Sequence, residues 1–207
     1  MNIRANLINS AVIPANARHK SLYMETRSFL QEKLSDLTTK AVFVGIGSEL
    51  RGDDAAGVVI VNRLAEMAKT VDCPRFLFIN GGSAPENILG EIRAFQPEVI
   101  VFIDAAILGG APGTVRVIDT SLEKISGISF CTHSLPLTII ADYIRQSISC
   151  EIFVIGIEPG DMNFRADCVL TPPVTQAVEA VIKDIVNYTG FVRGYNMFPL
   201  PFPPASA

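Results

Sequence analysis

The fold class follows most directly from residues 41–67, AVFVGIGSELRGDDAAGVVIVNRLAEM. This stretch opens with an apolar run at 41–46, which predicts a buried strand. A turn that contains Gly47 and the acidic pair Asp53 and Asp54 comes next. Apolar residues then recur at helical spacing as far as about Met67. The stretch is therefore expected to be a strand, loop and helix unit.

The rest of the chain repeats this alternation. Further strands are expected at 75–79, 99–103, 114–118 and 151–157, and helices at 85–95, 135–147 and 172–188. Thr171 suits the N-cap of the last helix, Pro172 its first position and Gly190 its end. The order predicts an α/β protein with a three-layer α/β/α arrangement and a largely parallel or mixed central sheet. In such a sheet the site lies at the carboxyl ends of the strands.

Composition narrows the class of protein. The 207 residues suit one domain, and 49% hydrophobic against 18% charged residues predict a large core. A net charge of −4 leaves no basic excess for nucleic acid, and the apolar runs are far shorter than the roughly 20 residues that cross a bilayer. The four cysteines form no C-x-x-C pair, which favours a reducing, cytoplasmic location.

Three parts are expected along the chain. Residues 1–39 form an N-terminal extension with one helix at 21–37, where Leu22, Phe29, Leu30, Leu34 and Leu37 fall at helix-like intervals. Residues 40–190 form the main domain. Residues 191–207 form a tail rich in aromatic residues and proline, without a helix or strand period. Either extension docks a partner or packs on the domain.

Asp54, Asp104 and His133 are the candidate functional residues. Asp54 follows the first strand, Asp104 closes the apolar run VIVFID, and His133 precedes a predicted helix. Two carboxylates and one imidazole suit a borderline divalent metal such as zinc or nickel, with open positions left for substrate. The alternatives are an Asp that caps a turn, an acid that stabilises a helix N-terminus and a structural His. Asp53 is assigned to the helix N-terminus.

Other chemistries fit the sequence less well. Leu50 stands where a dinucleotide fingerprint needs its third glycine, and the two acids after it would repel a pyrophosphate. Ser134 lies in no G-x-S-x-G elbow, and a buried inert thiol is the simpler interpretation of Cys131.

Four motifs in order, GIGSELRGDDAAG, NGGSAPEN, VFIDAA and THSLPL, resemble those of nickel-iron hydrogenase maturation endopeptidases over about residues 40–189. NGGSAPEN resembles the corresponding motif of the family branch that serves the hydrogenase of formate hydrogenlyase. The resemblance implies a phosphorylase/hydrolase-like α/β/α fold. It also implies an enzyme that removes the C-terminal extension of a hydrogenase large-subunit precursor after nickel insertion. Asp54, Asp104 and His133 fall on the family's metal-contacting positions.

The resemblance further implies that nickel arrives with the precursor, while zinc or another divalent metal could bind the isolated protein. Two departures stand out: Ser48 replaces the usual Asn, and Asn80 replaces an Asp of many members. An amide cannot act as a base near neutral pH, so Asn80 raises a question about proteolysis. The alternatives are a non-proteolytic, nickel-sensing assembly factor and an unrelated metal-dependent hydrolase.

Overall fold

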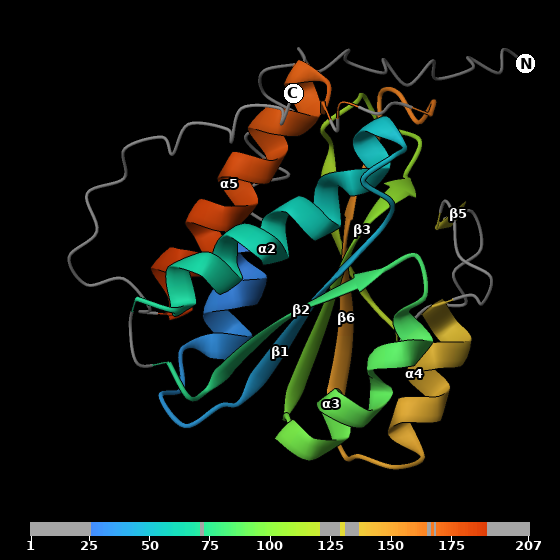
Figure 1. Ribbon diagram of the computed structural model, residues 1–207. Helices are drawn as coiled ribbons and strands as arrows, with labels where there is room; N and C mark the ends of the chain where they lie inside the picture. The colour runs from blue at the N-terminus through green and yellow to red at the C-terminus, as the bar shows by residue number, and fades with distance from the viewer. Residues whose placement is uncertain are drawn as a thin grey trace, which may run out of the picture.

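The computed structural model describes residues 26–70, 73–120, 129–130, 137–164, 167 and 169–189 (Figure 1). The strands are β1 (Ala41–Ile46), β2 (Phe76–Gly82), β3 (Val99–Ile107), β4 (Val115–Asp119), β5 (Ser129–Phe130) and β6 (Glu151–Ile157). The helices are η1 (Gly52–Ala55), α2 (Ala56–Ala68), η2 (Pro85–Ile88), α3 (Leu89–Phe95), α4 (Leu137–Arg145) and α5 (Pro172–Thr189). Residues 26–34 are also helical.

The central sheet is mixed, and its strand order is β2-β1-β3-β6-β4. β1 is parallel to both β2 and β3, β3 is parallel to β6, and only β4 runs antiparallel on this path. The short β5 pairs antiparallel with the end of β3. Because the chain moves outward from β1 to β2 and then returns to the other side of β1 as β3, the sheet has its topological switch point between β1 and β3.

Helices cover both faces of the sheet, which confirms the three-layer prediction (Figure 1). Alternate residues of β3 serve the two cores: Val99 and Val101 pack with α2 and α5, while Ile100 and Phe102 pack with α4. A strand buried on both faces is apolar throughout, and this explains the unbroken run at its start. None of the helices that the structure describes combines the length and apolar character needed to cross a membrane.

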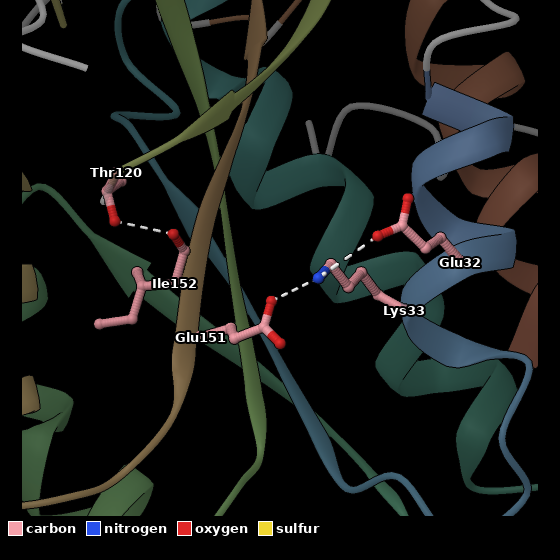
Figure 2. Close-up of polar contacts among 5 residues, drawn as sticks. All are labelled: Glu32, Lys33, Thr120, Glu151 and Ile152. Carbon is pink, nitrogen blue, oxygen red and sulfur yellow. Dashed lines mark hydrogen bonds and ion pairs between the residues drawn. The ribbon is translucent and has the colours of Figure 1, made fainter. Parts of the chain in front are cut away.

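The N-terminal helical segment packs on the main domain. Leu30 and Leu34 are buried in the core that α2 and α5 share. Lys33 lies between Glu32 and Glu151, with its Nζ 2.5 Å from Glu151 Oε2 at the start of β6 (Figure 2). Residues 26–34 are therefore part of the folded body.

This segment is shorter at its end than the sequence predicts. The helix stops at residue 34, and Leu37 lies outside it with 79% of its surface exposed. Asp36 Oδ1 accepts hydrogen bonds from both the N–H and the hydroxyl of Thr38, and such a local turn competes with further helix. Leu22, Gly190 and the tail at 191–207 lie outside the described residues.

Thr120, which directly follows β4, helps to hold this edge strand in the sheet. The N–H and the hydroxyl of Thr120 both donate to the carbonyl oxygen of Ile152 on β6, over 3.3 and 2.7 Å (Figure 2). β4 therefore remains attached to β6 just beyond its last paired residue.

Candidate functional site

Asp54 lies in η1, directly above the carboxyl end of β1, and it is fully buried. Its Oδ2 accepts a hydrogen bond from the Ser48 N–H over 3.0 Å, so the loop after β1 folds back over the carboxylate. Gly47 makes this possible. It has a φ of 131°, and a Cβ at this position would lie 1.7 Å from the Asp54 carbonyl oxygen. The G-x-G motif thus lets the backbone of the loop approach the Asp54 carboxylate, where a dinucleotide-binding motif would approach a phosphate.

Asp104 is also fully buried, and it lies at the same edge of the sheet. β1 pairs with β3 only as far as Ile103, so Asp104 is the first residue of β3 beyond that pairing. The start of α2 rests against this point, because a Cβ on Gly57 would lie 2.0 Å from the Ile103 carbonyl oxygen. Asp54 follows β1 and Asp104 lies just past the β1–β3 pairing, so both are near the switch point.

The strand that carries Asp104 is longer than the sequence predicts. β3 continues to Ile107, pairing with β6 through Ala105 and with β5 through Ala106 and Ile107. Asp104 consequently lies inside the strand and does not close it. Strand alternation puts Asp104 on the same face as Phe102 and Ala106, which belong to the core that contains α4 residues.

His133 and Cys131 lie outside the described residues. Within the part of the chain that the structure describes, no group of three His, Cys, Asp or Glu side chains could hold a metal ion. The three-residue metal site of Asp54, Asp104 and His133 thus stays a prediction. Its donor chemistry fits, because buried carboxylates suit a divalent cation and an imidazole is a common third ligand.

Asp53 has a different role from the one assigned from sequence. It does lie in the first turn of η1, but its carboxylate accepts hydrogen bonds from a distant loop. The donors are the N–H groups of Gly160, Asp161 and Thr171 and the Thr171 hydroxyl, at 2.7, 2.9, 2.7 and 2.8 Å. Asp53 therefore fastens η1 to the loop after β6 and to the start of α5.

Asn80 lies near the end of β2, exposed at the edge of the site. Its Oδ1 accepts a hydrogen bond from the Gly82 N–H over 3.0 Å, and its Nδ2 donates to Asn62 Oδ1 over 3.2 Å. Asn62 Nδ2 in turn donates to Glu49 Oε1 over 3.5 Å. Sequence reasoning missed Glu49 and Asn62, because nothing in their local pattern distinguishes them from ordinary surface residues.

The glycines after Asn80 have structural explanations. A Cβ on Gly81 would lie 3.0 Å from Val44 Cγ1 and 3.2 Å from the Gly45 carbonyl oxygen, so the strand needs a small residue there to pack on β1. Gly82 has a φ of 55°, which an L side chain rarely adopts. These constraints explain why glycine stands at both positions.

The fold, with two buried acids near the switch point of its mixed sheet, defines an α/β protein with an acidic candidate site. The family model described as Hydrogenase maturation protease matches residues 58–188. Hydrogenase 3 maturation protease of Escherichia coli is 31% identical over 149 residues, which are 72% of this chain and 90% of that protein.

Solved structures agree with this match. The crystal structure of a [NiFe] hydrogenase maturation protease from Thermococcus kodakarensis is 33% identical, with a TM-score of 0.69, and covers 78% of this chain and 99% of that one. The solution structure of an endopeptidase from Escherichia coli is 30% identical, with a TM-score of 0.59, over 73% of this chain and 90% of that one. The chain belongs to the hydrogenase maturation protease family and is a peptidase.

Proposed function

We propose that this peptidase removes the C-terminal extension of a nickel-iron hydrogenase large-subunit precursor after nickel has been inserted, and that it recognises the inserted nickel. The observation that supports the proposal most directly is the burial of two carboxylates, Asp54 and Asp104, at one edge of the sheet. Carboxylate oxygens are suitable ligands for a divalent cation. A metal-bearing substrate supplies such a cation.

In this proposal Asp54, Asp104 and His133 contact nickel that belongs to the substrate. Hydrolysis adds one water across the scissile amide: its oxygen bonds to the carbonyl carbon, the C–N bond breaks, and a proton goes to the leaving nitrogen. A metal ion assists such a reaction by polarising the carbonyl or the water. The protein's part is to hold the precursor's nickel and the adjoining peptide at the switch point.

We also propose a cytoplasmic location. Cys150 is a free cysteine, which suits a reducing compartment.

Nickel recognition is tested by offering the purified protein two forms of one precursor, nickel-loaded and nickel-free, and measuring cleavage by mass spectrometry. The expected result is cleavage of the loaded form alone. Equal cleavage of both forms would overturn nickel recognition. Binding of the loaded form without cleavage would instead favour a non-proteolytic, nickel-sensing assembly factor, the alternative that Asn80 raises.

The metal content of the protein gives an independent test. Only three protein ligands are proposed, and the precursor completes the site, so the isolated protein should lose divalent metal on desalting against a chelator. Elemental analysis measures this. Stoichiometric zinc that survives the chelator would point to a metallohydrolase that works without a partner's metal.

A further inference from the structure

Three side chains form a hydrogen-bonded series that reaches the loop after β1, and we refer to Glu49, Asn62 and Asn80 as the amide relay. It begins where the Gly82 N–H donates to Asn80, passes from Asn80 to Asn62, and ends where Asn62 donates to Glu49. The relay links the end of β2, the outer side of α2 and the loop between β1 and η1.

The direction of donation in the relay is determined at both ends. The Gly82 N–H can only donate, so the oxygen of Asn80 must face it and the amide nitrogen must face Asn62. At the other end the Glu49 carboxylate accepts, so Asn62 presents its nitrogen to Glu49 and its oxygen to Asn80. Residue 80 must therefore donate toward Asn62. An amide does so, and a carboxylate cannot.

The relay acts on the loop that holds Asp54. The Gly47 N–H donates to the Gly82 carbonyl oxygen over 2.9 Å, and the Ser48 N–H donates to Asp54 Oδ2 over 3.0 Å. Glu49 is the next residue, and it ties the same loop to α2. The loop is thus held against β2 on one side and against Asp54 on the other.

We propose that Glu49, Asn62 and Asn80 are positioning residues for the peptidase reaction, and that the amide at position 80 is matched through Asn62 to the carboxylate at position 49. The inference rests on the proposed role of Asp54. It explains Asn80 as a hydrogen-bond donor that the relay requires, and not merely as the replacement of a catalytic base.

The test is a reversal of the relay. In Asn80→Asp two acceptors face Asn62 from opposite sides, and its single amide group can donate to only one of them. Processing of the nickel-loaded precursor should fall roughly fivefold, in line with the loss of one hydrogen bond. Adding Glu49→Gln supplies a new donor at the other end, so Asn62 can turn over and the relay re-forms in the opposite direction. The double variant should recover to within about twofold of the original rate.

A matched control uses Glu66, an exposed carboxylate on α2 that is hydrogen-bonded to Lys69 and lies outside the relay. Glu66→Gln should not rescue Asn80→Asp. Nitrogen–proton correlation spectra give a readout apart from activity, because the side-chain amide signals of Asn62 should move in Asn80→Asp and move again in the double variant. Thermal melting shows that each variant is folded.

Two results would overturn the inference: Asn80→Asp processing the precursor as fast as the original protein or faster, and the double variant being no better than Asn80→Asp alone. Asp54→Asn separates this failure from that of the proposed function. If Asp54→Asn still cuts at full rate, the proposed site is wrong. If it is inactive while Glu49 and position 80 show no coupling, only the relay is wrong.

Discussion

The two ends of α5 stabilise a buried acid in different ways. Asp53, beside the start of the helix, is 1% exposed and accepts four hydrogen bonds from uncharged donors. Asp184, near the end of the helix, is also 1% exposed, but its Oδ1 pairs with Arg27 Nε over 2.8 Å. Its Oδ2 has no hydrogen-bond partner among the described residues.

The two ends of α5 therefore differ in function: the first supports the candidate site, and the second attaches the N-terminal helical segment. Backbone donors at the first end hold η1 and the β6–α5 loop in one arrangement, and η1 also carries Asp54. At the second end one half-exposed arginine attaches the N-terminal helical segment to α5. We expect the loss of the Asp53 carboxylate to affect both function and stability, and substitutions at the second end to affect stability alone.

The largest effect is expected from Asp54→Asn and Asp104→Asn, each of which should abolish processing of the nickel-loaded precursor. Each of these carboxylates is buried, and a buried charge is costly, so neutralising either one should leave the melting temperature unchanged or slightly higher. Mass spectrometry of the precursor and thermal melting measure the two quantities. Full processing by both variants would refute the proposed site.

Asp53→Asn should destabilise the protein by about 2 kcal/mol, more than a helix-dipole contact would account for. An amide retains one accepting oxygen but turns an N–H group toward the Thr171 N–H or its neighbours. Urea denaturation measures the free energy of unfolding. Because η1 also carries Asp54, processing should fall too.

Thr171→Val provides the matched comparison for Asp53, because it removes only the hydroxyl that donates to the carboxylate. It should cost about 1 kcal/mol alone and less in the Asp53→Asn background. Strictly additive losses would mean that Asp53 does not hold the start of α5.

Much of the fold could be predicted from local pattern. Strands buried on both faces appear as unbroken apolar runs, so β1 and β6 have the predicted bounds and β3 begins where expected. The antiparallel direction of β4 and the two-residue β5 could not be predicted. Strand direction depends on pairing across the sheet, and two residues are too few to show a period.

The candidate site also contains residues that local sequence pattern reveals and residues that it does not. Asp54 and Asp104 could be found because each follows an apolar run, and parallel strands bring such positions to one edge. The role of Asp53 could not, since its acceptor atoms meet donors more than a hundred residues further along the chain. Glu49 and Asn62 were missed for a related reason: the relay exists only once α2 lies beside the end of β2.

The smallest effect concerns pH at the second end of α5. Burial raises the pKa of the Asp184 carboxyl above its ordinary value of 3.8, although Arg27 opposes the shift. A raised pKa means that the folded state binds the proton more tightly than the unfolded state does. The contribution of this carboxyl to stability is therefore full below pH 3.8 and is lost as the pH rises through its folded-state pKa.

Asp184→Asn removes this titration. Relative to the variant, the original protein should become less stable by up to about 1 kcal/mol as the pH rises across that window, a limit set by the partial compensation from Arg27. Urea denaturation of both proteins at several values between pH 4 and pH 7 measures the difference. Arg27→Gln is the informative control: it removes the opposing charge, so the pH dependence should steepen and shift to higher pH. If the difference between the original protein and Asp184→Asn is constant with pH, the arginine compensates the buried charge fully, and the two ends of α5 are equally well satisfied.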